Sequence, residues 1–268
     1  QSTIDRKIQT LVGERLRNHG KFLHSYGIEN AAVLVAETES GKVRAYHGSL
    51  DYFDLNIHGS IDGLQASRST GSVLKPFLYA LAMDEGMLAG ESLIPDIPST
   101  FAAFSPQNAD RDYRGLVRAR EALIQSLNVP AVRLLARYGL LPFYRFLEEA
   151  GIQSLFRSPS DYGLPLILGG AEARPIDIAC LYRGLGRGGI FGPLTLIEEN
   201  SGTSSADRRA KGLRLISPGA SYLCLDILKE LVRPGSEALW GSFQDKYPLA
   251  WKTGTSYGQR DAWAAGVS

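Results

Sequence analysis

The chain has 268 residues, enough for one large domain or two small ones with a substantial buried core. Its apolar content of 44% and charged content of 21% are ordinary for a globular protein, and no apolar run approaches the roughly 18 residues that span a bilayer. With 29 basic and 28 acidic residues, the net charge is +1, which gives no electrostatic reason to expect nucleic acid as a partner.

The N-terminal third is predicted to form one helix, two strands and a loop. Apolar residues among the first 16 positions recur at helical spacing and predict an amphipathic helix. Residues 31–36 and 42–46 predict two strands around a turn at Ser40-Gly41. Residues 48–68 are rich in Gly, Ser, Asp and Asn, which predicts a loop.

The rest of the chain is predicted to be mainly helical until its end. Helices are expected at residues 72–83, 117–125, from Pro130 onward, 143–149, 175–185 and 218–231. The polar stretch 199–211 predicts a loop, and strands 249–255 and 262–267 are expected to pair through a turn at Gly258. Strands at both ends with helices between them favour an α+β domain.

The first chemical signal is the Ser-x-x-Lys string formed by Ser72 and Lys75. Helical residues three apart share a face with Cβ atoms roughly 5–6 Å apart, so the lysine amine could reach the serine hydroxyl. Pro76 is tolerated only near a helix start, which predicts Ser72 at an N-terminal end that favours an oxyanion. Burial and a nearby Lys252 would lower the pKa of Lys75 and let it act as a base. Alone, the string is more typical of a capping serine followed by a surface lysine.

A second string, Ser126-Leu127-Asn128, lies between two predicted helices. A short loop there could point the serine and asparagine side chains out together. In a functional interpretation, Ser126 relays a proton to a leaving nitrogen, and Asn128 holds a substrate amide or Lys75. Alone, the string is more typical of an asparagine that caps a helix end.

The third string runs from Lys252 to Thr255 and predicts a strand at a sheet edge. Gly254 removes a side chain where another backbone must approach closely, and a substrate peptide could add to this strand. Lys252 and the hydroxyls of Thr253 and Thr255 would bind the peptide's terminal carboxylate. The backbone N–H groups of Thr255 and Ser72 would form an oxyanion hole. Alone, an exposed hairpin is the more common meaning of such a string.

Occurring in this order, the three strings resemble the signature of the transpeptidase domain of class A penicillin-binding proteins. The resemblance is closest to the 1C-type branch, through the Thr-Ser-Tyr-Gly run at 255–258 and the Arg-Asp-Ala-Trp run at 260–263. It extends from about Ala31 to the last residue. The sequence departs from the family at Thr70, usually proline, and at Val73, usually a small hydroxyl residue; neither position supplies a catalytic group.

This resemblance implies a peptidoglycan D,D-transpeptidase that works through a serine acyl-enzyme and is acylated by β-lactams. It implies one domain over residues 1–268, a mainly antiparallel sheet flanked by helices, and two further strands and a closing helix beyond Ser268. The implied partners are peptidoglycan stem peptides and β-lactams, with no cofactor or metal and no nucleic acid. The implied location is the bacterial cell envelope, on the periplasmic face of the inner membrane, with a membrane anchor upstream. The implied catalytic residues are Ser72, Lys75, Ser126, Asn128 and Lys252, and the implied substrate-binding residues are Thr253, Gly254 and Thr255.

Three other functions share the motifs. A class A β-lactamase adds an acidic residue that primes a water, but the associated loop signature, a glutamate followed three residues on by Leu-Asn, is absent. A D,D-carboxypeptidase carries every motif and stays open, as does a sensor or scaffold that is acylated without turnover. A Ser-His-Asp enzyme is disfavoured, because no Gly-x-Ser-x-Gly elbow occurs and the four histidines show no triad or metal spacing.

The cysteines and tryptophans are predicted to be packing residues. Cys180 and Cys224 lie in apolar runs, which is typical of buried free thiols, although a disulfide bridge stays open until their geometry is known. Trp251 and Trp263 are expected to pack against neighbouring residues, as is Trp240, which lies in a loop that could border the cleft.

Overall fold

The computed structural model describes residues 1–198, 212–231 and 248–268. The predicted loop at 199–211 and the prediction for Trp240 lie outside the described residues. Within the described part, no helix is both long enough and apolar enough to cross a membrane.

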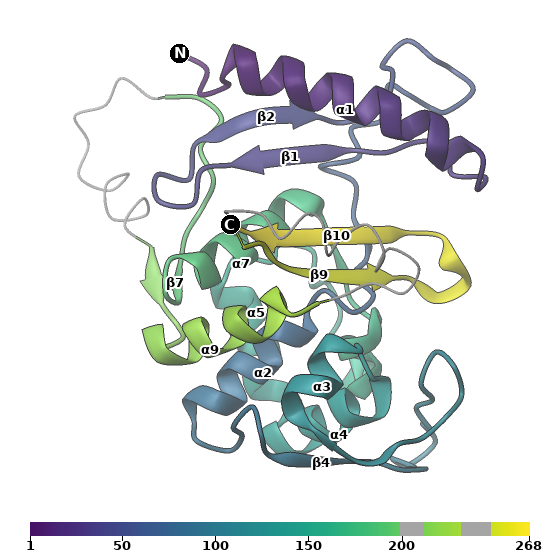
Figure 1. Cartoon of the computed structure of the whole chain (residues 1–268), viewed down its shortest axis with the longest axis vertical. Coiled ribbons are helices and arrows are strands. Elements are labelled where there is room, and N and C mark those ends of the chain that lie inside the picture. The colour runs from purple at the N-terminus through teal and green to yellow at the C-terminus, as the bar shows by residue number, and fades with distance from the viewer. Residues whose placement is uncertain (199–211, 232–247) are drawn as a thin grey trace.

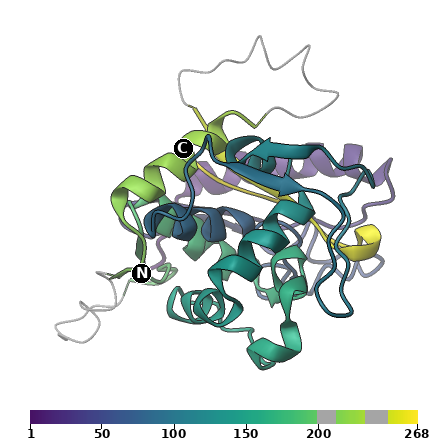
Figure 2. The same ribbon diagram turned by 90° about the horizontal axis from the view of Figure 1, so that it is seen from below.

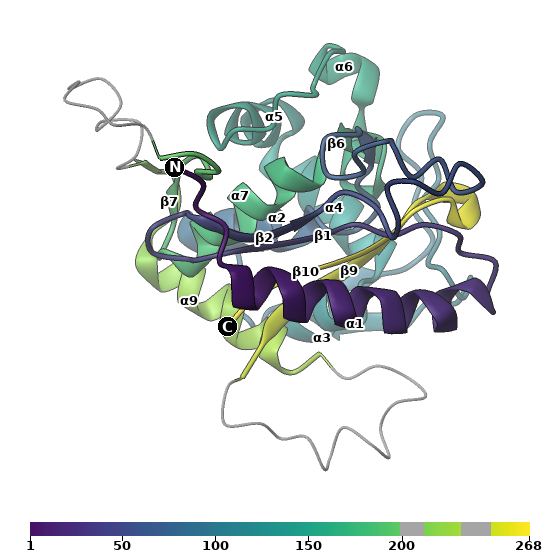
Figure 3. The same ribbon diagram turned by 90° about the horizontal axis from the view of Figure 1, so that it is seen from above.

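Two antiparallel strand pairs lie between the N-terminal helix and a group of helices (Figure 1). Strand β1 (Val33–Ala36) pairs with β2 (Val43–His47), and β9 (Ala250–Thr255) pairs with β10 (Ala262–Val267). Helix α1 (Arg6–His24) lies along the β1–β2 pair, as the view from above also shows (Figure 3). The four strands match the sequence-based expectations to within two residues at their ends, and α1 continues to His24, beyond the first 16 residues whose spacing predicted it.

The helical layer lies on the other side of the strands and is nearest the viewer in Figure 2. It contains α2 (Lys75–Asp84), α3 (Ala119–Ile124), α4 (Asn128–Tyr138), α5 (Leu140–Glu149), α6 (Pro159–Tyr162), α7 (Pro175–Gly186) and α9 (Pro218–Lys229), with the 3-10 helix η1 (Leu164–Leu168). Short strand pairs join this layer: β3 (Arg68–Ser69) with β6 (Glu172–Ala173), β4 (Leu93–Asp96) with β5 (Gly115–Arg118), and β7 (Ile190–Phe191) with β8 (Leu213–Arg214).

Helix α2 is the centre of the hydrophobic core. Its residues from Lys75 to Met83 are all buried, so its sequence is apolar on every side rather than on one stripe. The Phe77 ring packs edge-on against Tyr182 of α7 at 5.2 Å and also contacts Phe146 of α5 at 6.2 Å. The core therefore holds α2, and with it Lys75, rigidly in place.

The structure corrects three expected element boundaries. Helix α2 begins at Lys75 rather than Ser72, because residues 71–74 form turns and Gly71 is left-handed with φ of 51°. Val117 belongs to strand β5, paired with Ile94, rather than to a helix. Helix α4 begins at Asn128, and Pro130 lies in its first turn, where no intrahelical N–H bond is needed.

Both cysteines are free thiols in the structure. Cys224 is buried, and its thiol donates to the Pro76 carbonyl of α2 at 3.3 Å. Cys180 is only partly buried. The prediction of free thiols is thus confirmed, while the burial of Cys180 is less complete than expected.

Candidate active site

The three sequence motifs come together in space. Lys75 opens α2, Ser126 and Asn128 flank the α3–α4 junction, and Lys252 lies on β9. Hydrogen bonds join Lys75 to both junction residues, and Lys252 to Ser126. Segments separated by up to 177 residues in the sequence thus form one polar cluster inside an otherwise apolar region.

Lys75 is fully buried, and its amine has three acceptors within 3.2 Å. Its Nζ donates to the carbonyls of Ser126 at 2.7 Å and Leu127 at 3.2 Å, and to Asn128 Oδ1 at 2.8 Å. Burial, and then the positive charge of Lys252, hold the pKa of Lys75 well below its usual range. The acceptors around the amine stabilise its protonated form. Burial and the charge of Lys252 act in the opposite direction and favour loss of its proton.

Ser126 connects the two lysines. Its Oγ accepts a hydrogen bond of 2.7 Å from Lys252 Nζ and lies 3.5 Å from Lys75 Nζ. Its backbone is left-handed, with φ of 59°, an uncommon conformation for a residue with a side chain. In this conformation both the carbonyl and the hydroxyl of Ser126 face the lysines. The left-handed backbone is unfavourable in energy, and the hydrogen bonds to the lysines accompany it.

Ser72 lies in the turn immediately before α2 and is half-buried. Its carbonyl accepts from the Lys75 N–H at 3.2 Å, which closes the turn. Among the described residues, neither its Oγ nor its backbone N–H has a hydrogen-bond partner. Both groups are thus available to a ligand, as a nucleophile and an oxyanion donor would need to be.

Strand β9 packs directly against the serine turn, and two glycines permit the contact. A Cβ on Gly254 would lie 2.7 Å from the Thr70 carbonyl and 3.0 Å from the Ser72 nitrogen. A Cβ on Gly71 would lie 2.7 Å from both the nitrogen and the oxygen of Thr255. The close approach expected at Gly254 is present, and Gly71 makes a matching approach from the other side.

The two residues at which the sequence departs from the family pattern support this turn. Thr70 is buried, and both its backbone N–H and its Oγ1 donate to the Ala171 carbonyl at 3.1 Å; a proline could donate neither bond. Val73 is fully buried against Gly254, and its carbonyl accepts from Tyr182 at 2.9 Å. The turn is therefore held by contacts of its own.

Residues absent from the sequence-based site also hold the turn in place. The indole of Trp263 on β10 donates to the Ser69 carbonyl at 2.8 Å, and Ser69 Oγ donates to the Gly169 carbonyl at 2.8 Å. The sequence predicts only a packing role for Trp263. The Arg-Asp-Ala-Trp run at 260–263, which ends at this tryptophan, indicated the family. Nothing in that run predicted the hydrogen bond to Ser69.

The two threonines of the third motif are not brought into the lysine cluster. Side chains alternate along a strand, and here Lys252 and Gly254 are buried, Thr253 is half-buried and Thr255 is exposed. No hydrogen bond among the described residues connects either threonine hydroxyl to Lys75, Ser126 or Asn128. The predicted contact of Thr253 and Thr255 with a substrate carboxylate would therefore lie outside the cluster of Lys75, Ser126, Asn128 and Lys252.

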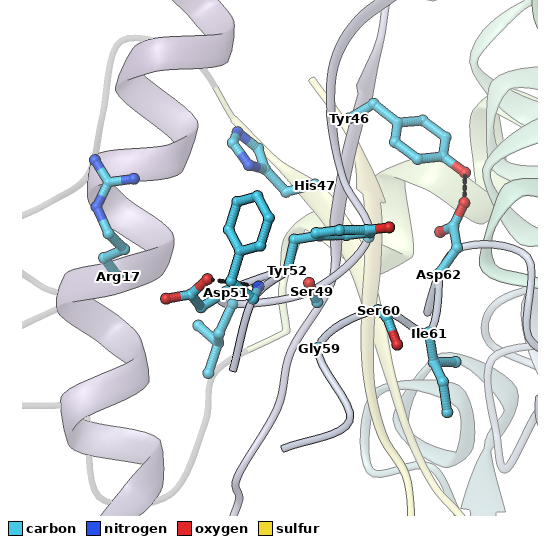
Figure 4. Close-up of a pocket in the computed structure, with 13 residues that line it drawn as sticks. Arg17, Tyr46, His47, Ser49, Asp51, Tyr52, Gly59, Ser60, Ile61 and Asp62 are labelled. Atoms are coloured by element: carbon cyan, nitrogen blue, oxygen red, sulfur yellow. Dashed lines mark hydrogen bonds between the residues drawn. The ribbon is translucent and has the colours of Figure 1, made fainter. Parts of the chain in front are cut away.

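A separate pocket of about 530 Å³ lies between α1 and the loop at residues 48–62 (Figure 4). Arg17 reaches toward it from α1, and Tyr52 and Asp62 line it from the loop. Its lining contains none of the motif residues. In the described part of the chain, this pocket included, no group of three or more His, Cys, Asp or Glu side chains is arranged to hold a metal.

Comparison with known proteins gives one consistent family. The family model described as "Penicillin binding protein transpeptidase domain" matches residues 31–262. The chain is 38% identical over 237 residues to penicillin-binding protein 1C of Escherichia coli K12, covering 88% of this chain and 29% of that protein. It is 27% identical over 273 residues to penicillin-binding protein 1A of Neisseria cinerea, covering 95% of this chain and 33% of that protein. The chain thus spans about a third of the length of these curated relatives.

Solved structures agree on the fold. The penicillin-binding protein PonA1 of Mycobacterium tuberculosis superposes with a TM-score of 0.76 at 23% identity, covering 100% of this chain and 72% of that one. Penicillin-binding protein 1A of Haemophilus influenzae gives 0.70 at 23% identity, covering 88% and 41%. The expected α+β fold, with antiparallel strands flanked by helices, is confirmed.

Proposed function

The chain belongs to the family of penicillin-binding protein transpeptidase domains, and we propose that it is a serine D,D-transpeptidase acting on peptidoglycan stem peptides, with residues 1–268 working as one domain. The observation that carries the proposal is the meeting of two buried lysines at Ser126, beside a serine whose hydroxyl and N–H lack partners among the described residues. A buried lysine with a lowered pKa, in the helix that starts directly after the turn of a serine with an unpartnered hydroxyl, suits nucleophilic acyl transfer.

In this mechanism, Ser72 Oγ attacks the carbonyl of the penultimate D-alanine while the neutral amine of Lys75 takes the hydroxyl proton. The oxygen–carbon bond forms, and the peptide C–N bond breaks. Ser126, placed between Lys75 and Lys252, passes a proton to the leaving D-alanine nitrogen. An amine from a second stem peptide then attacks the ester, forms the cross-link and restores the Ser72 hydroxyl.

The donor strand would bind along β9. A peptide added there as an extended strand places its carbonyl near the N–H groups of Ser72 and Thr255, which we assign to the oxyanion hole. Lys252, Thr253 and Thr255 are assigned to the terminal carboxylate, and Gly254 to the close approach. A β-lactam would acylate Ser72 in the same way. The location that goes with this function is the bacterial cell envelope, on the periplasmic face of the inner membrane.

A fluorescent penicillin tests the proposal. We expect a stoichiometric, long-lived adduct that maps to Ser72 by peptide mass spectrometry, because the ring-opened ester stays tethered and blocks an incoming amine. The adduct should disappear in Ser72→Ala and persist in Ser160→Ala, an exposed serine outside the site. Rapid hydrolysis of the drug would indicate a β-lactamase, and a label on another residue would contradict the mechanism.

Turnover of a donor stem peptide separates the remaining functions. A transpeptidase releases one D-alanine per enzyme on acylation, and it turns over and forms a cross-link only when an acceptor amine is present. A carboxypeptidase turns over in the absence of the acceptor. A scaffold would form the penicillin adduct and release no D-alanine under either condition. The cross-linked product, followed by mass spectrometry, is the result that the proposal requires.

A further inference from the structure

Asn108 is a buried asparagine outside the three motifs, and every donor and acceptor of its side-chain amide makes a hydrogen bond. Asn108 is only 4% exposed. Its Nδ2 donates to both carboxylate oxygens of Asp96, at 2.8 and 3.0 Å, and to the Asp112 carbonyl at 2.8 Å. Its Oδ1 accepts from the backbone N–H groups of Asn128 at 2.8 Å and Val129 at 3.2 Å. The side-chain amide has therefore no unused donor or acceptor position.

Asp96 determines which way this amide points. It is fully buried at the end of β4, and it also accepts from the Arg114 N–H at 3.0 Å. Both carboxylate oxygens of Asp96 accept here, so Asn108 turns Nδ2 toward Asp96. Its Oδ1 is thereby directed at the start of α4, where helix N–H groups have no intrahelical partner. The N-cap residue of α4, Leu127, makes no side-chain hydrogen bond to the helix. Asn108, from a segment 20 residues earlier, caps the helix instead.

The same segment also orients the Asn128 side chain. Asn128 Nδ2 donates to the Gln107 carbonyl at 2.8 Å, which leaves its Oδ1 for Lys75 Nζ, also at 2.8 Å. Gln107 and Asn108 thus hold both the backbone and the amide of Asn128. A continuous series of hydrogen bonds runs from Asp96 through Asn108 and Asn128 to the amine of Lys75.

We propose that Asn108, oriented by Asp96, is a positioning residue that sets where Asn128 presents its acceptor oxygen to Lys75. The inference rests on the proposed function, because its consequence for rate depends on Lys75 acting at Ser72. Acyl transfer needs the amine held within reach of its proton donor, and a displacement of about 1 Å can cost on the order of 100-fold in rate. Asn108 touches neither substrate nor the reacting atoms and acts through Asn128.

Substitutions at Asn108 and Asp96 distinguish an effect on the position of Asn128 from a loss of folded protein. Asn108→Asp keeps an oxygen for the α4 N–H groups but sets a second carboxylate against Asp96 and loses the donor to Asp112. Adding Asp96→Asn returns a donor–acceptor pair between the two positions. We expect acylation by a fluorescent penicillin to fall on the order of 100-fold in Asn108→Asp and to recover substantially in the double variant. Thermal melting measured alongside gives the folded fraction at the assay temperature.

The protonation of Lys75 supplies a readout that does not depend on catalysis. Lys252 from β9 is the charged neighbour acting on Lys75. On α2, burial and then the charge of Asp96 raise the pKa of Tyr79. Loss of Asn108 lets Asn128 withdraw an acceptor from the ammonium, which lowers the pKa of Lys75 further. In Asn108→Ala we therefore expect the Lys75 Cε resonance, assigned by its loss in Lys75→Met, to titrate at lower pH than in the wild type.

The matched control is Ser99→Ala. Ser99 Oγ accepts from Arg133 of α4 at 2.8 Å, so its removal costs this helix a bond without touching Asn108. It should leave both the Lys75 titration and the acylation rate unchanged. A wild-type titration and a wild-type rate per folded molecule in the Asn108 variants would overturn the inference. A shifted titration in a protein that forms no Ser72 adduct would support the positioning role and contradict the proposed function instead.

Discussion

Lys75 combines two opposing demands at the scale of a single residue. Three acceptors within 3.2 Å of Nζ match the three donors of an ammonium group, and they lower its energy when it is charged. Complete burial and the charge on Lys252 act in the other direction and dominate the pKa. The result is an amine that is held in one position and yet gives up its proton more readily than a surface lysine.

Replacing either lysine should affect a different step. Lys75→Ala removes the base, so acylation of Ser72 should fall by about 10²- to 10⁴-fold at every pH. Lys252→Ala removes a positive neighbour and raises the pKa of Lys75, so more of this amine is protonated near neutral pH. The acid limb of the acylation profile should then move to higher pH, and affinity for a carboxylate-bearing drug should fall.

The measurement is the second-order acylation rate of a fluorescent penicillin from pH 5 to pH 10. Lys229→Ala is the control, because this lysine pairs with Asp226 on the surface of α9. Equal and mild losses in the Lys75 and Lys252 variants, with unshifted profiles, would contradict the separate roles.

At the scale of elements, the contact between β9 and the serine turn depends on the absence of a side chain. Gly254→Ala places a Cβ 2.7 Å from the Thr70 carbonyl and 2.9 Å from Val73 Cγ1, and neither buried group can move away freely. We expect a loss of about 1–3 kcal/mol in unfolding free energy. We also expect acylation to slow by more than the unfolded fraction explains, because the strand shifts from Ser72.

Gly219→Ala is the control for this change. Gly219 lies in the first turn of α9 with no atom within 4 Å of its added Cβ, and alanine is the better helix former. Denaturant unfolding and the acylation rate should both stay at or slightly above wild type. A Gly254→Ala protein that acylates normally would show that the close approach does not matter.

The packing of α9 against α2 leads to a prediction about thiol chemistry. Burial raises the pKa of Cys224 to about 12, and burial also raises the pKa of Cys180. Thiolate is the reactive form, so neither cysteine should react quickly with Ellman's reagent in the native protein at pH 8. Both should react after unfolding in guanidinium chloride. Fast native labelling of Cys224 would show that α9 opens readily.

For the whole molecule, the unpaired edge of β10 is the feature that favours association with another chain. The described residues place β9 and β10 in a two-stranded sheet, so the far edge of β10 has no strand partner among them. Open edges pair readily with other chains, and a lysine on the edge opposes this. We predict concentration-dependent association that Ala264→Lys, at an exposed β10 position, reduces.

Sedimentation velocity over a range of protein concentrations checks this prediction. Thr10→Lys adds the same charge at an exposed position on α1 and should leave association unchanged. If the chain is monomeric at every concentration, or if both lysine variants behave alike, the β10 edge is not the surface through which chains associate.

Much of this protein was determined locally and is therefore readable in the sequence. The apolar run that makes α2, the terminal strands and the turn at Gly258 follow from short-range pattern and backbone preference. The candidate site was equally accessible, because Ser72, Lys75 and Lys252 lie in short strings whose order is typical of one family. Gly254 carried its own signal, since a glycine within a strand indicates close backbone approach.

Only the tertiary structure decided how these pieces meet. Strand β5 pairs with β4 across a proline-containing crossing, so nothing near Val117 marks it as a strand. The left-handed backbone of Ser126 exists because buried lysines from two other elements need its carbonyl and hydroxyl. Asn108 caps a helix that begins 20 residues later, and no local pattern records a cap supplied from that distance. These features depend on contacts between residues far apart in the chain, and local sequence patterns do not reveal such contacts.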